Sequence, residues 1–154
     1  MAGPGSSSPP TPRPSVEEHL AREGHRLTGP RRAVLDVLAA SDAPLSVADI
    51  HRRLGDGRAN VVSVYRTVNL LIRMRLVRHT DTGRTGSRYE LAEEFTGHHH
   101  HLICDRCGRI EDVAGCLVPD AALAQLNQRM LRSRQFRVTA HELRLFGLCR
   151  SCDQ

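Results

Sequence analysis

The sequence predicts an α+β fold made of two parts, an N-terminal winged helix-turn-helix domain and a small C-terminal α/β dimerisation domain. Segments with the helical spacing of apolar residues precede two short strand-like segments, which is the order of a winged helix. The second half offers only a modest core, and small modules of this kind often need a metal or a partner chain. We place the boundaries at residues 1–14 (a disordered tail), 15–91 (the winged helix), 92–97 (a hinge) and 98–154 (the metal-binding dimerisation domain).

The first helix follows a tail that has little to bury. Residues 1–14 contain five prolines and no large apolar residue after Met1, so burial cannot offset the entropy of ordering them. Residues 15–24 (SVEEHLAREG) then predict a short helix. Ser15 can cap its N-terminus, two glutamates suit the positive end of the helix dipole, and Gly24 can end it.

Two further helices are expected at residues 27–41 and 46–55. Thr28 suits the N-cap of the first, with a proline in its opening turn. Ser46 and Asp49 have the spacing of a capping box at the start of the second. In both segments the apolar residues recur at helical intervals and predict one inward face.

A third strong helical pattern spans residues 60–75 and precedes a hairpin. Two short strands are expected at residues 76–81 and 87–91, around a Gly-containing loop. This order is that of a winged helix, in which the helix before the wing has an outward polar face. The expected buried stripe is Val61, Val64, Val68, Leu71 and Ile72.

The second half alternates strand and helix patterns. Strands are expected at residues 100–104 and 109–113, and a helix at about 119–132. A last strand is expected over residues 136–146, although its apolar alternation is imperfect. These elements make a small α/β module.

The positive charge is confined to the first half. Residues 1–80 hold 12 arginines against 7 acidic residues, whereas residues 81–154 hold 10 of each. A basic half joined to a neutral half predicts a polyanion such as nucleic acid as the partner of the first, the alternative being a solvated basic surface. No apolar run approaches the roughly 18 residues that span a bilayer, so we expect a cytoplasmic protein with no membrane partner.

Five cysteines stand in a chain without a secretory signal, which favours metal or redox chemistry over disulfides. Two Cys-x-x-Cys pairs have the spacing of a structural zinc site, in which four thiolates leave no open position. A thioredoxin-like redox pair is the alternative. Cys116 is the odd cysteine, read either as a small apolar side chain or as an accessory ligand or redox-sensitive thiol. The predicted zinc ligands are Cys104, Cys107, Cys149 and Cys152.

Four consecutive histidines precede the first cysteine pair. Side chains alternate faces in an extended segment, so His99 and His101 would point one way and His98 and His100 the other. This geometry can supply two metal sites, and imidazole suits Zn(II), Fe(II), Mn(II) or Ni(II). The alternative is a solvated run. The further candidate ligands are His79, Glu90, Glu111, Asp112, Asp120 and His141.

Taken together, these residues resemble the ferric uptake regulator superfamily. The motifs that carry the resemblance run in the family's order over about residues 20–152: RLTGPRRAVLDVL, SVADIHRRL, VVSVYRTVNLLIRMRLV, RYEL, HHHHLICDRCGRI and HELRLFGLCRSC. The resemblance implies a homodimeric, metal-dependent repressor that binds an A·T-rich palindromic operator in double-stranded DNA. It implies DNA contacts from Tyr65 and Arg66, and the full set of expected contacts is Arg31, Ser63, Tyr65, Arg66 and Thr67.

The resemblance also assigns the two faces of the histidine run. It implies a regulatory site between the halves at Glu90, His99, His101 and Asp112, with His79 beside the wing as a candidate additional ligand. A second site would use His98, His100 and His141, with Asp120 or Cys116 in place of the family's glutamate, because Pro119 stands at that position.

Two departures leave the regulatory metal open. Iron-type members usually have a histidine where this chain has Pro44 and Leu45, and zinc-type members a cysteine where it has Leu91 and Ala92. We expect a structural Zn(II) and a regulatory Zn(II) or Fe(II), with zinc slightly favoured and Mn(II) or Ni(II) less so, because a histidine-rich site suits the softer ion. The expected function is repression of metal homeostasis genes, for zinc or iron uptake. A peroxide-sensing regulator of the same family is the alternative.

Ligands from both halves suggest how metal would control DNA binding. One ion held by both sets would select one inter-domain arrangement, and two recognition helices of a dimer would then fit major grooves about 34 Å apart. Two other classes compete, a metallohydrolase with Glu111 as its acid–base group and a zinc-stapled interaction module. The first lacks a pocket or nucleophile motif, and the second leaves the basic half unexplained, so we expect no enzyme.

Overall fold

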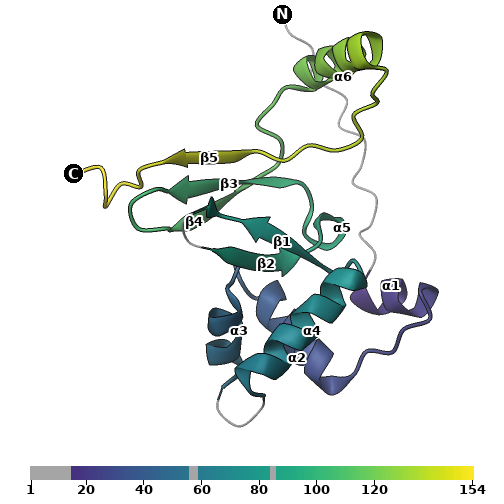
Figure 1. Cartoon of the computed structure of the whole chain (residues 1–154), viewed down its shortest axis with the longest axis vertical. Coiled ribbons are helices and arrows are strands. Elements are labelled where there is room, and N and C mark those ends of the chain that lie inside the picture. Colours follow the sequence, from purple (N-terminus) through teal and green to yellow (C-terminus); the bar gives the residue numbers. More distant parts are fainter. Residues whose placement is uncertain (1–14, 56–58, 84–85) are drawn as a thin grey trace, which may run out of the picture.

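The computed structural model describes residues 15–55, 59–83 and 86–154. The tail predicted at residues 1–14 lies outside these described residues. Figure 1 shows the helices of the first half gathered below the wing hairpin, with the C-terminal sheet above it. No helix in the described part of the chain has the length and apolar character needed to cross a membrane.

The first half is a winged helix, as the sequence predicts. Its second, third and fourth helices pack on one another, and its two strands form the wing. The elements are α1 (Val16–Arg22), α2 (Gly29–Ala39), α3 (Val47–Leu54), α4 (Val61–Arg73), β1 (Val77–Asp81) and β2 (Ser87–Leu91).

Local capping places these helices where the sequence pattern puts them. The amide of Glu18 donates to Ser15 Oγ over 3.1 Å, and the Glu18 carboxylate accepts from the Ser15 amide over 2.8 Å. Ser46 and Asp49 form the same reciprocal pair at the start of α3. Both predicted caps are therefore confirmed, whereas Thr28 precedes α2 without a side-chain cap bond.

The core of the chain lies mainly in this half. Val64, Val68 and Leu71 of α4 are buried against a cluster that runs from Leu20 of α1 to the wing. The prediction that Val61 joins them is wrong, because it is 48% exposed. Val61 is the first residue of α4, and its side chain points outward on the first turn, which makes that turn available to a partner.

The wing is tied to the helices by backbone hydrogen bonds. β1 and β2 pair antiparallel, with Arg78 opposite Glu90. Leu45, just before α3, forms a bridge with Tyr89 of β2 through bonds of 2.9 and 2.8 Å. Strand β2 is therefore fixed both to its hairpin partner and to the helix-turn-helix.

The second half contains a three-stranded sheet in the order β4-β3-β5. β3 pairs antiparallel with β4 and parallel with β5. A short helix, α5, lies within the predicted hinge at residues 92–97. The elements are α5 (Glu93–Thr96), β3 (His99–Cys104), β4 (Ile110–Ala114), α6 (Asp120–Arg134) and β5 (Arg144–Gly147).

The last strand is shorter than expected, because only residues 144–146 of the predicted 136–146 segment belong to β5, which ends at Gly147. Ala140 and Leu143 are three residues apart, so the apolar alternation changes face between them and cannot serve one continuous strand. The segment before β5 instead places His141 near His98 and His100.

Helix α6 has no buried residue in the single chain. Figure 1 shows it set apart from the sheet. Leu126 and Leu131 are 46% and 49% exposed, so these apolar side chains of α6 are not covered within one chain. Exposed apolar surface of this extent is typical of an interaction face.

Candidate metal centres

Four cysteines from two segments converge at one end of the C-terminal sheet. The ligand atoms of Cys104, Cys107, Cys149 and Cys152 all lie within 4.8 Å of one another. The sulfurs of Cys107 and Cys149 are 3.7 Å apart. Gly108 has a φ of 72° and donates its amide to the Cys104 carbonyl over 2.8 Å, which lets the first pair turn tightly.

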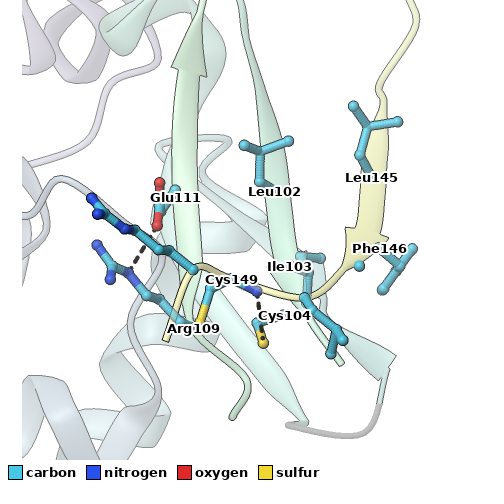
Figure 2. Close-up of a pocket in the computed structure, with 11 residues that line it drawn as sticks. Leu102, Ile103, Cys104, Arg109, Glu111, Leu145, Phe146 and Cys149 are labelled. Atoms are coloured by element: carbon cyan, nitrogen blue, oxygen red, sulfur yellow. Dashed lines mark hydrogen bonds and ion pairs between the residues drawn. The ribbon is translucent and has the colours of Figure 1, made fainter. Parts of the chain in front are cut away.

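The chemistry of these thiols fits a bound zinc ion. Backbone amides of Cys107 and Cys149 hold the pKa of Cys104 down at about 6, and Figure 2 shows the Cys149 amide directed at that sulfur. Burial and the neighbouring sulfurs raise the pKa of Cys152 to about 12. Four crowded thiols ionise together only beside a cation, and a tetrahedral Zn(II) supplies that charge with no position left open.

A second group of ligands lies where the wing meets the C-terminal sheet. Glu90 comes from β2, His99 and His101 from β3, and Asp112 from β4, with their ligand atoms all within 4.8 Å of one another. The pairing of β3 with β4 sets His101 opposite Asp112. We call these four residues the interdomain cluster, and they are four of the five predicted regulatory ligands.

Glu90 is the centre of this cluster. Its Oε1 accepts a hydrogen bond from Thr80 Oγ1 over 2.7 Å and lies 3.1 Å from His101 Nε2. Its Oε2 lies 3.0 Å from His99 Nε2. Asp112 Oδ1 lies 3.0 Å from the other ring nitrogen of His101, so two carboxylates flank one imidazole.

The pKa values of Glu90 and His101 both favour a positive charge inside the cluster. Burial opposes ionisation of Glu90, but hydrogen bonds from His101 and Thr80 and the charge of Arg78 outweigh it and lower its pKa to about 2. Burial also opposes charge on His101, yet Asp112 and Glu90 raise its pKa to about 9. A divalent ion can take the place of the His101 proton, and two imidazoles with two carboxylates suit Zn(II), Fe(II) or Mn(II).

Arg78 of β1 is a member of this neighbourhood that sequence reasoning missed. Its Nε donates to Glu90 Oε1 over 2.8 Å, and one terminal nitrogen donates to His99 Nε2 over 3.0 Å. His99 Nδ1 faces the Gly97 carbonyl at 2.8 Å, which fixes the ring proton there and leaves Nε2 as the acceptor. The register of the hairpin sets Arg78 opposite Glu90, and the sequence analysis predicts the two strands without that register.

His79 is the fifth predicted regulatory ligand, and the structure does not bring it into the cluster. Neighbours in a strand point to opposite faces, so β1 turns Arg78 and Thr80 toward Glu90 and His79 away from it. The exposed His79 ring instead lies tilted against the Tyr89 ring, with ring centroids 5.6 Å apart. The regulatory set therefore loses an imidazole relative to the sequence prediction.

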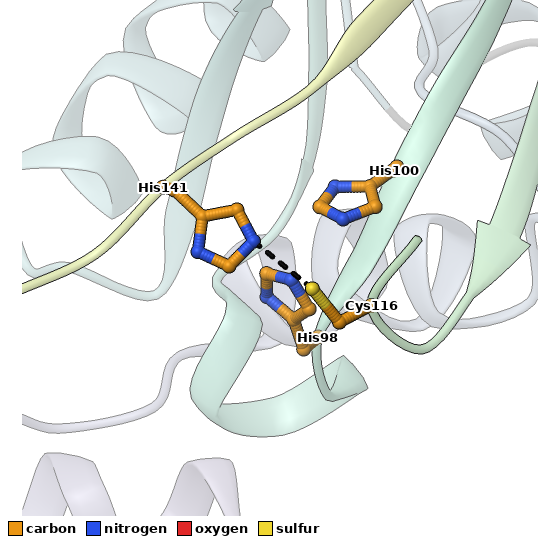
Figure 3. A group of neighbouring side chains, drawn as sticks. All are labelled: His98, His100, Cys116 and His141. Carbon is orange, nitrogen blue, oxygen red and sulfur yellow. Dashed lines mark hydrogen bonds between the residues drawn. The ribbon is translucent and has the colours of Figure 1, made fainter. Parts of the chain in front are cut away.

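The opposite face of β3 carries a third group. His98, His100 and His141 come together as predicted, and the fourth member is Cys116 (Figure 3). Asp120, the predicted carboxylate, is not brought into this group and lies at the exposed start of α6. Burial and the nearby His98 and His141 lower the pKa of His100, which favours the neutral ring that a metal binds.

The predicted DNA-contact residues lie mostly on the outward face of α4. Ser63, Tyr65 and Arg66 are exposed, Tyr65 to 52%, and Thr67 is half-buried. Arg31 lies at the start of α2, where its guanidinium donates to the Arg26 carbonyl over 2.7 Å. An exposed aromatic beside an arginine near a helix N-terminus is an arrangement suited to thymine methyl, phosphate and base-edge contacts.

Known proteins share this sequence and this fold. The sequence model of the ferric uptake regulator family matches residues 22–146. The ferric uptake regulation protein of Bacillus subtilis is 28% identical over 142 residues, which cover 90% of this chain and 92% of that protein. The peroxide operon regulator of B. subtilis is 30% identical over 139 residues, which cover 89% of this chain and 90% of that protein.

Solved structures give the same result. The Helicobacter pylori ferric uptake regulator, described as having three functional metal binding sites, superposes with a TM-score of 0.69 at 27% identity, covering 90% of this chain and 89% of that one. The family match spans most of the chain and includes helices α2 to α4, the wing, the histidine run and the first cysteine pair. The chain belongs to the ferric uptake regulator family.

Proposed function

We propose that this chain is a dimeric transcriptional repressor that binds its operator in response to a metal ion held by the interdomain cluster. The observation that carries the proposal is the origin of the ligands. Glu90 belongs to the wing of the DNA-binding half, whereas His99, His101 and Asp112 belong to the sheet of the other half. We place the division between the halves at residues 92–97, which form α5 and its neighbours.

This division of ligands gives the cluster control over the angle between the halves. A bound divalent ion would link the two halves of the chain, and all four ligands could reach it only at one angle between the halves. Glu90 is fixed in β2, and β2 is fixed to the helix-turn-helix through the bridge between Tyr89 and Leu45. Ligand binding that favours one arrangement shifts the population toward it, so the position of α4 follows the occupancy of the cluster.

The part of the winged helix that would contact DNA is the first turns of α4. Asn60 caps the helix by accepting from the Ser63 amide over 2.8 Å, which fixes the turn that presents Tyr65 and Arg66. The basic charge of the first half attracts the phosphate backbone. Arginine at this position can also bind a guanine edge with two hydrogen bonds, which gives sequence preference.

Dimerisation would supply the second recognition helix. The apolar side chains left uncovered in the C-terminal half lie on α6 and along the edge of the sheet. Figure 2 shows Leu102 and Leu145 side by side on β3 and β5, with Phe146, the next residue of β5, directed away from them. Leu102 and Leu145 are 39% and 46% exposed, and a second copy of this face would cover them. In a two-fold dimer, the two α4 helices could then fit successive major grooves.

The identity of the regulatory ion follows only in part from the ligand set. With His79 outside the cluster, two carboxylates and two imidazoles remain, and this set accommodates Fe(II) or Mn(II) as readily as Zn(II). We propose zinc or iron, acting on genes of metal homeostasis.

A peroxide-responsive role is the second candidate function. It is favoured by the 30% identity to the peroxide operon regulator of B. subtilis, and by a carboxylate-rich set that can hold Fe(II). In this variant, iron bound at the cluster would promote oxidation of a ligand histidine. A gain of one oxygen atom on His99 or His101 after peroxide treatment of the iron-loaded protein would distinguish it from a simple metal sensor.

The test compares two histidine variants, H99A, which changes a residue of the interdomain cluster, and H79A, which changes a histidine of the wing outside it. DNA is first selected from a random duplex pool with wild-type protein and metal. H99A should then need at least about tenfold more metal for half-maximal binding, because it loses a ligand. H79A should match wild type, because His79 is exposed and outside the cluster. Equal metal dependence of H99A and wild type would refute the proposal.

A further inference from the structure

Helix α5, which stands between the two halves of the chain, is attached to the winged helix by three contacts. Its N-cap residue, Ala92, donates its amide to the Leu76 carbonyl just before β1 over 2.9 Å. Phe95 is partly buried against the core of the winged helix. Glu94 forms an ion pair with His19 of α1, with 3.1 Å between Oε1 and Nδ1. Figure 1 shows α1 and α5 near the end of α4 that leads into β1.

His19 joins three helices through one side chain. Its Nδ1 faces Glu94 of α5, and its Nε2 donates to the carbonyl of Met74, the C-cap residue of α4, over 3.3 Å. Its ring meets that of Phe95 edge to face, with ring centroids 5.6 Å apart. Both polar neighbours are acceptors, so the protonated ring donates from both nitrogens. The imidazole therefore connects α1, α4 and α5.

The contact with Met74 fixes the last turn of α4. The final carbonyls of a helix have no partner within the helix, and His19 supplies a partner for one of them. This bond is sheltered, because the side chain of His19 is 11% exposed and Met74 is 7% exposed. The side chain of Glu94 is 42% exposed, so solvent screens the ion pair more strongly. The two contacts together hold α5 on the end of α4.

Two adjacent glutamates of α5 contact opposite halves of the chain. The carboxylate of Glu93 contacts Nδ1 of His98, which immediately precedes β3. Glu94 contacts His19 on the winged-helix side. Strand β3 carries two ligands of the interdomain cluster, so α5 forms a bridge from this strand to the end of α4. This bridge is separate from the connection that Glu90 makes through β2.

We infer that His19 is a positioning residue that holds α5 on the end of α4, so that the arrangement selected by an ion at the interdomain cluster is passed to α4. This role rests on the proposed metal response. His19 itself belongs to none of the ligand groups among the described residues. Without its polar contacts, Ala92 and Phe95 still attach α5, but the end of α4 is no longer tied to it.

The test compares H19A, H19F and E94Q with wild type, using the full chain with its four-cysteine site filled by zinc. The quantity measured is the gain, defined as the ratio of the dissociation constants for the selected duplex without and with the activating ion. H19F keeps an aromatic ring beside Phe95 and lacks both polar contacts. The gain should fall by at least about threefold in H19A and H19F, the scale on which residues along such a path alter coupling.

E94Q should reduce the gain less, because its amide oxygen can still accept a hydrogen bond from His19. It changes a side chain that is 42% exposed, so the fold is kept. E23Q removes the same charge from the exposed end of α1 and should match wild type. Metal affinity in the absence of DNA should be unchanged in all these variants, since none of them alters a ligand.

Amide hydrogen exchange in the metal-free protein provides a readout that needs no ion. The Gly97 amide donates to the Glu93 carbonyl over 2.7 Å and closes α5. This amide should exchange faster in H19A and H19F than in wild type, and E23Q should leave it unchanged. Equal exchange in all four proteins would overturn the assignment of His19.

The DNA measurements separate this inference from the proposed function. A wild-type metal response that H19A and H19F retain in full would overturn the role of His19 and leave the proposed function intact. The absence of any metal response in wild type would overturn the proposed function, and the positioning role of His19 with it.

Discussion

The guanidinium group of Arg78 donates a hydrogen bond to Nε2 of His99 over 3.0 Å, across the boundary between the two halves of the chain. The same side chain binds Glu90 Oε1 over 2.8 Å. A permanent positive charge therefore contacts two of the four atoms that an ion in the interdomain cluster would need. Because His99 Nε2 has a single lone pair, it cannot serve Arg78 and an ion at once.

Replacement of Arg78 by glutamine should strengthen divalent metal binding at the interdomain cluster by about tenfold or more, equivalent to about 1.4 kcal/mol. The variant removes a competing cation and frees the His99 lone pair. Affinity is measured by competition with a chromophoric chelator after the four-cysteine site is filled with zinc.

Arginine 88 provides the matched control for this experiment. It lies on the same hairpin, but its side chain binds Asp49 of α3 over 2.9 Å. R88Q should leave metal affinity unchanged. If R78Q weakened metal binding, Arg78 would instead be a supporting partner of Glu90 in the occupied site.

The four-cysteine centre should be required for the stability of the C-terminal half. C149S is expected to lose the tightly held zinc and to lower the midpoint of thermal unfolding by about 10 °C or more, because this half buries few apolar side chains. Metal content and differential scanning calorimetry measure both effects. C116S, another single cysteine change, should retain that zinc, and equal loss in the two variants would contradict the assignment of ligands.

Arg66 should contribute to DNA binding without contributing to stability. R66A is expected to weaken binding to the selected duplex by about 1–3 kcal/mol if Arg66 contacts a base, or to reduce the salt dependence by about one counterion if it contacts a phosphate. R73A removes the same charge from the far end of α4 and should have a smaller effect. Equal losses in both variants would indicate a general charge effect, without a recognition turn at the N-terminal end of α4.

Asp49 should stabilise the winged helix in a pH-dependent manner. Its hydrogen bonds with Ser46, and further interactions with Arg52 and Arg88, outweigh burial and lower its pKa below the ordinary value of 3.8. A depressed pKa means that the stabilisation is complete above about pH 4 to 5 and is lost as pH falls through the folded value. D49N should therefore cost about 1 kcal/mol at pH 7, the usual value of a cap.

Urea unfolding of wild type and D49N over pH 3 to 7 measures this dependence. The difference between the two proteins should shrink toward the acid end, since the wild-type carboxylate becomes protonated. D36N, which changes an exposed carboxylate of α2, should follow wild type throughout. A D49N difference that stayed constant with pH would show that the carboxylate charge does not matter.

Much of the winged helix could be predicted from local sequence signals. Capping boxes at Ser15 and Ser46 and the apolar spacing of α4 are written in neighbouring residues, and the structure confirms them. The faces of β3 also follow from strict alternation, which is why His99 and His101 could be paired in advance. The family assignment and the fold class are confirmed for the same reason, since they depend on these motifs.

The predictions that were wrong depend on contacts between segments distant in the sequence, which local patterns do not reveal. The exclusion of His79 depends on which face of β1 meets Glu90, and so on the register of the hairpin. The choice of Cys116 over Asp120 depends on where the loop after β4 ends and α6 begins. The predicted strand at residues 136–146 failed because its pairing partner, β3, accepts only the last residues.

The most direct test of the account is the binding of wild-type protein, with its four-cysteine site filled by zinc, to the selected DNA duplex during separate titrations with Zn(II), Fe(II) and Mn(II). The account predicts that at least one of these ions raises the affinity for this duplex by about tenfold or more, and leaves binding to a scrambled duplex unchanged. It also predicts that this metal response disappears in H99A. Tight, sequence-specific binding that is the same with every ion and with none would contradict the central claim that the interdomain cluster controls DNA binding.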